Sequence, residues 1–260
     1  MRKLYESVNL QKPRGHKALL GNIFSGLVDI IYPKTCLCCK AKLSDSDAMD
    51  EAICLSCWRK IKRNTPPFCI RCGKHLEKNN ISKNICPSCT RKQLHFDRAF
   101  SPSVYEGTLK ELIHQFKYKG KGHIGKPLSR LMLHFIKEYR VPVEYVDLIV
   151  PVPLHKARLR QREFNQAHIL SSHLAKDLSK TVSPDILIRN RDTRTQTDLE
   201  PEMRFSNVKG SFSVTDTAQI RGKNILLVDD VLTTGATCSE AAYALKDSGA
   251  NIVFVMTLAN

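Results

Sequence analysis

The residues with the most specific chemistry follow a short apolar run near the carboxyl end of the chain. The run Ile225–Val228 is typical of a buried strand, and it ends in two adjacent carboxylates, Asp229 and Asp230. A turn of small and hydroxyl-bearing residues comes next, and a helical pattern follows from Ser239. Free N–H groups at a helix N-terminus favour an anion, and carboxylates accept hydrogen bonds from sugar hydroxyls. The segment therefore predicts a site for a sugar phosphate.

Roles for the individual residues follow from this arrangement. We expect Asp229 and Asp230 to hold the ribose hydroxyls and to be the catalytic residues of any reaction at the site. We expect a 5′-phosphate to lie on the turn, which contains Thr233, Thr234, Gly235, Ala236 and Thr237. In the plainer alternative, both aspartates only cap the helix after a buried strand. The order of strand, turn and helix favours the sugar-phosphate site.

A nucleotide-triphosphate site is a competing interpretation, in which the two aspartates hold magnesium behind a P-loop. The segment Gly120–Lys126 has the glycine and lysine spacing of such a loop. However, Pro127 stands where a serine or threonine would bind magnesium, and no apolar strand precedes Gly120. The sequence therefore argues against this alternative.

Nine of the ten cysteines lie between Cys36 and Cys89. Eight of them form pairs with two residues between the partners: Cys36/Cys39, Cys54/Cys57, Cys69/Cys72 and Cys86/Cys89. Two such turns place four thiolates around one tetrahedral ion, so the pattern predicts two structural zinc ions. We recognise no export signal, which favours the reducing cytoplasm and metal ligation over disulfides. Spacing leaves consecutive and interleaved pairing of the turns equally open.

Hydropathy and charge narrow the class of protein. No stretch approaches the roughly 20 uninterrupted apolar residues of a membrane span, and the segment 18–32 is expected to be a packing helix. The formal net charge is +16, and residues 1–95 hold 18 basic against 7 acidic side chains. Eight thiolates on two zinc ions would remove about four of these charges and leave the region basic. Nucleic acid is therefore a candidate partner, although charge alone gives only non-specific binding.

Three regions are expected along the chain: a tail and helix over residues 1–33, the double cysteine-pair module over 34–95, and an α/β domain over 96–260. Strand and helix patterns alternate in the last region, which is the signature of a Rossmann-like parallel sheet. We expect strands over 99–105, 146–152, 224–231 and 252–258, and helices over 108–118, 127–139, 165–178 and 239–248. The polar stretch 188–212 has little periodicity, so we expect it to be a lid loop.

A cationic segment follows the strand expected over 146–152. It carries four basic residues from Lys156 to Arg162, at the carboxyl end of a strand, where open α/β sheets bind ligands. Guanidinium groups suit phosphate oxygens. We therefore expect Arg158, Arg160 or Lys117 to neutralise a pyrophosphate together with magnesium. Taken alone, the segment also fits a solvated basic loop.

Two resemblances emerge from these motifs. The segment 225–237 is similar to the signature with which type I phosphoribosyltransferases hold phosphoribosyl pyrophosphate (PRPP). The order of a cysteine-pair module, a Val-Pro-Val-Pro-Leu-His strand end at 150–155, a Phe-Asn-Gln-Ala helix start at 164–167 and the PRPP turn resembles the ComF family. That resemblance covers the chain from about Cys36 onwards, and it includes the spacing of the lid residues Arg191 and Gln196.

The ComF resemblance implies a phosphoribosyltransferase domain behind a zinc module, with PRPP or a related phosphoribosyl ligand bound together with magnesium. We expect Arg191, Arg194 and Gln196 to close over the ligand from the lid. The resemblance also implies a cytoplasmic role in natural competence, in which single-stranded DNA is internalised with a ComFA-like helicase and other competence proteins. Two functions stay open: phosphoribosyl transfer to an unidentified acceptor, and a non-catalytic factor that senses PRPP or a nucleotide and binds DNA and proteins.

Two departures from the family pattern bear on the site. Glu163 stands where the family commonly has glycine, and a carboxylate in a pyrophosphate segment would oppose the ligand unless it points away or holds magnesium. Arg194 and Thr195 stand where prolines are common, which predicts a more flexible and more cationic lid.

Overall fold

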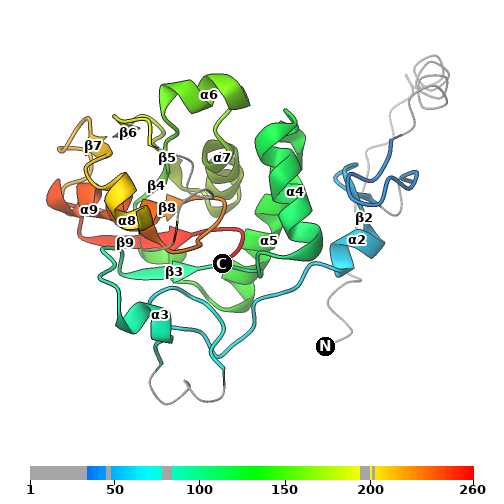
Figure 1. Ribbon diagram of the computed structural model, residues 1–260, viewed down its shortest axis with the longest axis horizontal. Helices are drawn as coiled ribbons and strands as arrows, with labels where there is room; N and C mark the ends of the chain where they lie inside the picture. Colours follow the sequence, from blue (N-terminus) through cyan, green and yellow to red (C-terminus); the bar gives the residue numbers. More distant parts are fainter. Residues whose placement is uncertain (1–33, 45–47, 78–83, 194–199, 201–202) are drawn as a thin grey trace.

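A parallel sheet forms the centre of the molecule (Figure 1). The computed structural model describes residues 34–44, 48–77, 84–193, 200 and 203–260. Its five strands lie in the order β3 (Arg98–Phe100), β9 (Ile252–Met256), β8 (Asn224–Val228), β4 (Leu148–Pro151) and β5 (Thr181–Val182). Every neighbouring pair of these strands is parallel. The prediction of an α/β fold with a parallel sheet is therefore confirmed.

Helices cover both faces of the sheet and explain why its strands are apolar throughout. Side chains alternate between faces along a strand. Leu226 and Val228 of β8 accordingly belong to the core built with α4 (Gly107–Tyr118), α5 (Gly125–Glu138) and α7 (Gln166–Leu178). Ile225 and Leu227 belong to the opposite core, with α9 (Ala236–Asp247). Burial on both sides is what makes parallel strands read as continuous apolar runs.

The polar stretch after the sheet's fifth strand differs from the predicted lid loop. Strand β6 (Leu187–Arg189) pairs antiparallel with β7 (Phe212–Val214), and helix α8 (Met203–Val208) lies between them in sequence. These elements are too short to show a clear periodicity, which is why the prediction missed them. The basic segment after β4 is likewise a helix, α6 (Lys156–Arg162), rather than a loop.

The remaining elements are small. The cysteine-rich region contains β1 (Ala48–Met49), β2 (Ile53–Cys54), α2 (Leu55–Arg59) and α3 (Pro87–Thr90), and the turns before α5 and β4 are the 3-10 helices η2 (Gly122–Ile124) and η3 (Val143–Tyr145). The helix expected over residues 18–32 lies outside the described residues. Within the described part of the chain, we find no helix with the length and apolar character that a membrane crossing needs.

The paired cysteines gather into two clusters, and the pairing is consecutive. Cluster 1 contains Cys36, Cys39, Cys54 and Cys57, and cluster 2 contains Cys69, Cys72, Cys86 and Cys89. In each cluster the sulfur atoms lie within 4.8 Å of one another. The Sγ–Sγ distances of 3.7 Å between Cys39 and Cys54 and between Cys72 and Cys86 are close to the edge of about 3.8 Å of a zinc–thiolate tetrahedron. A disulfide bond would need about 2.05 Å. The geometry fits two structural zinc ions.

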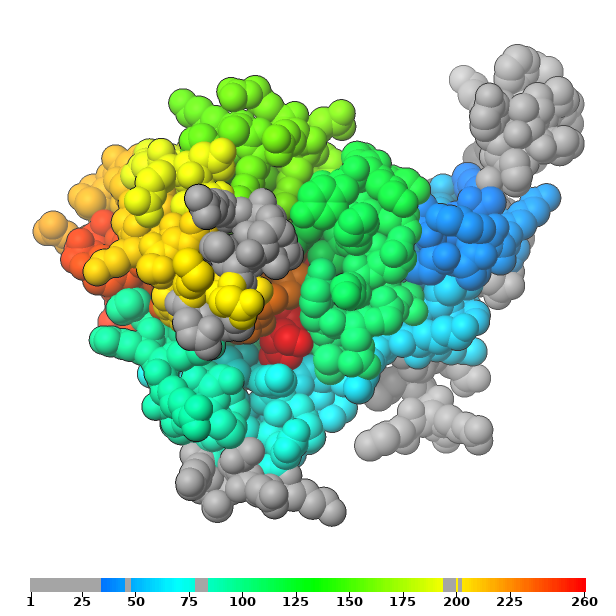
Figure 2. All heavy atoms as spheres, in the orientation of Figure 1, coloured from blue at the N-terminus to red at the C-terminus, as the bar shows by residue number. Residues whose placement is uncertain are grey.

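The two clusters pack on different parts of the domain (Figure 2). Cluster 1 lies beside α4 and α5, because Trp58 and Ile61 share their core and the Gln115 amide of α4 donates to the Leu37 carbonyl at 2.8 Å. Cluster 2 lies at the β3 edge of the sheet, where the backbone N–H of Ala99 donates to the Arg71 carbonyl at 2.7 Å. The cysteine-rich region therefore wraps the domain instead of standing apart from it.

Metal analysis and metal removal test whether the two clusters bind structural zinc. We expect two zinc ions per purified chain, because each cluster provides a complete set of four thiolates. Stripping them with a chelator should lower the melting temperature by roughly 10 °C or more, since structural zinc contributes several kcal/mol of folding free energy. Metal analysis and thermal unfolding measure both quantities. Clearly substoichiometric zinc, or an unchanged melting temperature after its removal, would contradict the assignment.

The packing of cluster 2 also has a consequence for the turn before α9. Residues Cys86 and Cys89 of cluster 2 and residues Leu232 to Gly235 line one small cavity. We therefore expect Cys89→Ser to accelerate amide hydrogen exchange at residues 232–239 by about tenfold or more, because loss of cluster 2 unpacks that turn. Cys39→Ser in cluster 1 is the matched control and should leave these amides protected. Equal acceleration in both variants would show that the turn depends on global stability alone.

Candidate functional site

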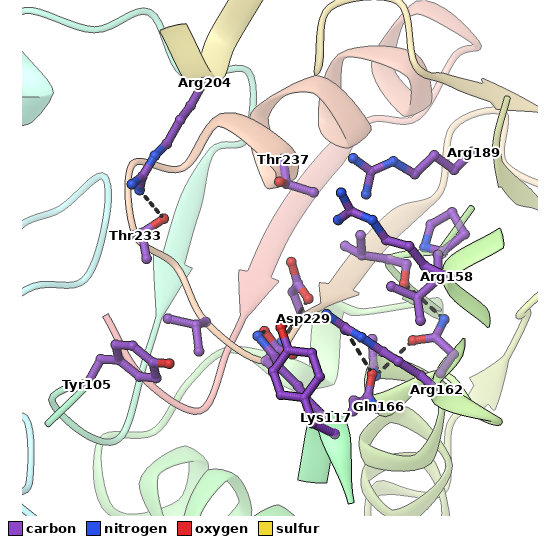
Figure 3. Close-up of a pocket in the computed structure, with 18 residues that line it drawn as sticks. Tyr105, Lys117, Arg158, Arg162, Gln166, Arg189, Arg204, Asp229, Thr233 and Thr237 are labelled. Atoms are coloured by element: carbon purple, nitrogen blue, oxygen red, sulfur yellow. Dashed lines mark hydrogen bonds and ion pairs between the residues drawn. The ribbon is translucent and has the colours of Figure 1, made fainter. Parts of the chain in front are cut away.

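A cavity opens where strands β4 and β8 end side by side (Figure 3). The carboxyl ends of neighbouring parallel strands are the usual ligand site of open α/β sheets. The acids Asp229 and Asp230 follow β8 and line the cavity, and β4 is followed by Val152, which lines the opposite part. Five cations from four further elements also line it: Lys117 of α4, Arg158 and Arg162 of α6, Arg189 of β6 and Arg204 of α8.

The two acids are held differently. Asp230 is 7% exposed, and its Oδ1 lies 2.9 Å from the ammonium nitrogen of Lys117. The Oδ1 of Asp229 accepts a hydrogen bond from the Asp230 backbone N–H at 2.8 Å, and its Oδ2 lies 3.7 Å from the Cys238 thiol. Burial, and then the charge of Asp230, raise the pKa of Asp229 to about 7. Near neutral pH the pair therefore carries between one and two negative charges.

The turn that follows the acids leads into α9. Gly235 is the N-terminal cap of α9 and has a φ of 84°, a left-handed conformation that suits glycine. A Cβ atom at this position would also lie 3.3 Å from Leu94. Thr233 and Thr237 line the main cavity, whereas Thr234 and Gly235 face cluster 2. The N-terminal turn of α9 thus borders the cavity through Thr237, and a helix N-terminus is favourable for an anion.

Two guanidinium groups face the cavity from the other side of Asp229, as Figure 3 shows for Arg158 and Arg189. Both donate to Thr193, Arg158 to its carbonyl at 2.5 Å and Arg189 to its hydroxyl at 2.6 Å. Arg189 is only 9% exposed, and its Nε has no hydrogen-bond partner in the described part of the chain. Burial, and then the charge of Arg158, lower the pKa of Arg189 to about 10, so it stays cationic at neutral pH.

The predicted binding residues are only partly brought together at this cavity. Lys117 and Arg158 line it, but Arg160 lies exposed on α6 and is not among the lining residues. Arg191 is also exposed, and it donates to the backbone carbonyls of Asn207 and Lys209 instead. Ala236 is buried at the first position of α9. The predicted lid residues Arg194 and Gln196 lie outside the described residues.

The departure at Glu163 has a structural explanation. Glu163 caps the C-terminus of α6 with a φ of 67°, which is the position where a glycine is favoured. Its Oε2 faces Gly120, at 3.3 Å from where a Cβ atom would stand on that residue. Glu163 is exposed and does not line the cavity. Its carboxylate therefore does not oppose an anion bound there.

Three cavity cations were not among the predicted binding residues: Arg162, Arg189 and Arg204. The signal for Arg189 lies in the structure and not in the sequence, because only the three-residue strand β6 shows that Leu187 and Arg189 are buried while Ile188 is exposed. A charged residue at an inward strand position is costly unless it has a partner, so it marks a site. For Arg204 the sequence signal is its place at the lid spacing of the ComF family, and in the structure it reaches Thr233 from α8 at 3.4 Å.

Two family models match parts of the chain and agree with this architecture. Residues 27–90 match the double zinc ribbon domain family, and residues 165–260 match the phosphoribosyl transferase domain family. A solved structure of glutamine PRPP amidotransferase from Bacillus subtilis has a TM-score of 0.38 and 19% identity to the chain. The similar region covers 55% of this chain and 30% of that one.

Several curated proteins are similar over most of the chain. DNA utilization protein YhgH of Salmonella typhimurium is 32% identical over 231 residues, which are 88% of this chain and 98% of that protein. Competence protein F of Haemophilus influenzae is 29% identical and covers 86% of this chain and 96% of its own length. Competence protein ComFC of Bacillus subtilis is also 29% identical, over 84% of this chain and 91% of its own. The chain therefore belongs to the ComF family, in which a double zinc ribbon precedes a phosphoribosyltransferase domain.

Proposed function

We propose that the cavity binds phosphoribosyl pyrophosphate. The observation that supports this proposal is the arrangement of three recognition elements around one cavity: the turn at the start of α9, the acid pair, and the guanidinium groups of Arg158 and Arg189. The turn would bind the 5′-phosphate, Asp229 and Asp230 the ribose hydroxyls, and the guanidinium groups the pyrophosphate. Five cations against two carboxylates among the described lining residues suit a ligand with several negative charges.

Magnesium enters the proposal as a companion of the pyrophosphate. This ion prefers oxygen ligands and is usually held by one or two carboxylates together with substrate phosphates. The acids of this cavity are two, and Asp230 is already paired with Lys117. The pyrophosphate oxygens of the ligand therefore fit magnesium better than a site made by the protein alone. When bound, the ion would neutralise charge on the leaving pyrophosphate.

The reaction that we propose is transfer of the phosphoribosyl group to an acceptor. As the bond from ribose C1 to pyrophosphate breaks, positive charge develops on the sugar, and the bond to the acceptor nucleophile forms there. The ionised acid pair would stabilise that charge, while Arg158 and Arg189 would stabilise the departing pyrophosphate. Pyrophosphate release during a screen of acceptors, nucleobases included, tests turnover.

A second candidate function is a factor that senses PRPP or a nucleotide without turnover. It is favoured by the lining of the cavity, since the described part includes no histidine that would act as a general base. The names of two relatives, competence protein F and competence protein ComFC, support a role in natural competence for either function. For that role we propose a cytoplasmic location, with single-stranded DNA and a ComFA-like helicase as partners. Absence of pyrophosphate release with every acceptor, alongside intact PRPP binding, would favour this candidate.

Calorimetry with PRPP tests the binding site residue by residue. We expect Arg189→Met to weaken PRPP binding by roughly 10- to 100-fold, because a charge-assisted contact to the pyrophosphate contributes about 1.5–3 kcal/mol. The same variant should bind ribose 5-phosphate nearly as well as the wild type does, because this ligand has no pyrophosphate group for residue 189 to contact. Arg160→Met, on the exposed face of α6, is the matched control and should behave as wild type. The double variant Asp229→Asn/Asp230→Asn with unchanged affinity would refute the site.

The raised pKa of Asp229 gives the binding a pH dependence. Below its pKa of about 7 the carboxyl is protonated, and above it the ionised group is a stronger acceptor for ribose hydroxyls. Affinity for ribose 5-phosphate should therefore rise several-fold between about pH 6 and pH 8. The second ionisation of the phosphate contributes to this rise, and Asp229→Asn isolates that contribution. An identical pH profile in wild type and variant would exclude Asp229 as the titrating group.

A further inference from the structure

Lys117 supplies the only ion pair that the described residues make with the acid pair. Its ammonium nitrogen lies 2.9 Å from Oδ1 of Asp230, and the two side chains are 18% and 10% exposed. Burial lowers the pKa of Lys117, but the charge of Asp230 and the hydrogen bond to it outweigh that effect and raise the pKa above its ordinary value. The ammonium is therefore permanently charged at neutral pH.

The acid pair has little capacity left for a metal ion. Of its four carboxylate oxygens, Oδ1 of Asp230 faces the ammonium, Oδ1 of Asp229 accepts a backbone N–H, and Oδ2 of Asp229 faces the Cys238 thiol. Within the described part of the chain, only Oδ2 of Asp230 is without such a partner. A divalent ion held by both oxygens of Asp230 would have to displace the lysine, and an ion on Oδ2 alone would be repelled by the ammonium charge. A ribose hydroxyl, in contrast, needs only one acceptor oxygen.

The cation that compensates the acid pair comes from helix α4, which is distant in sequence from the segment that carries the two acids. Lys117 lies at the end of α4, and it points up to the acids from below in Figure 3. Helix α4 is fixed two residues earlier, because the Gln115 amide bonds the Leu37 carbonyl in the loop of cluster 1. The position of the ammonium is therefore set by tertiary packing, as a preorganised cation requires.

We propose that Lys117 is the resident counter-cation of the acid pair, so that the ribose 5-phosphate half of the ligand binds without a divalent metal. The inference rests on the proposed function and names a chemical class: phosphomonoesters of ribose are metal-free ligands of the cavity. Lys117 is a positioning residue that neutralises Asp230 and leaves an acceptor oxygen for the sugar. Any need for magnesium then arises from the pyrophosphate alone.

Calorimetry with ribose 5-phosphate, in EDTA and in excess magnesium chloride, tests the inference. For the wild type we expect affinities that agree within about twofold in the two buffers. Lys117→Met leaves the two carboxylates uncompensated, so its affinity should fall at least about tenfold in EDTA and recover largely in magnesium. Lys117→Arg keeps a cation and should retain binding in EDTA. Lys119→Met removes an exposed lysine outside the cavity and is the matched control.

A second measurement reports the metal itself. Electron paramagnetic resonance of added Mn²⁺ should show no ion bound at the acid pair of the wild type and one ion bound in Lys117→Met, with thermal unfolding as the check that the variant is folded. Ribose 5-phosphate binding that requires magnesium in the wild type would overturn the inference and leave the proposed function intact. Failure to bind in both buffers would overturn the proposed function, and the inference with it.

Discussion

Two adjacent carboxylates, set at the buried end of a parallel strand, are the constraint on which the site depends. Like charges this close raise each other's cost of ionisation, and partial burial adds to that cost. The structure offsets it with the ammonium of Lys117 on Asp230 and with a backbone N–H on Asp229. The helix α9 starts within reach and adds the positive end of its dipole. The pair can therefore stay ionised at this buried position, and Oδ2 of Asp230 is left as an acceptor for a ligand.

Both cysteine clusters support the ligand site, and each cluster packs on a different element that borders it. Cluster 1 packs on α4, the helix that presents Lys117 to the acids. Cluster 2 packs beside the turn before α9, where the φ of 84° favours a glycine at position 235 and the Leu94 side chain lies close to it. Asn260, at the end of the chain, reaches the Cys72 carbonyl at 3.4 Å and ties the last strand to the same cluster. Zinc ligation in this protein thus bears on the ligand site through packing as well as on folding.

The sequence predicted the strand, the two acids, the turn and the helix of the ligand site, because each of these features depends on residues that are close together in the chain. The cysteine clusters were equally local, although spacing could not distinguish consecutive from interleaved pairing. The cations depend on tertiary packing and were predicted less well. Arg158 and Arg162 are four residues apart and share one face of α6, whereas Arg160 lies between them and points to solvent. Because the segment was not predicted to be a helix, the sequence offered no reason to distinguish the two cavity arginines from Arg160.

Arg189 shows what the sequence could not predict, because the strand that buries it is only three residues long. An arginine at an inward position of a short strand is not explained by folding, because burying a guanidinium costs free energy unless it is paired. The packing of its guanidinium over the Phe212 ring at 5.3 Å compensates for only part of that cost. The rest of that cost is not compensated, and the nearby positive charge of Arg158 adds repulsion to it. An anion in the cavity would relieve both penalties at once, which is why this energetically unfavourable arginine is informative about function.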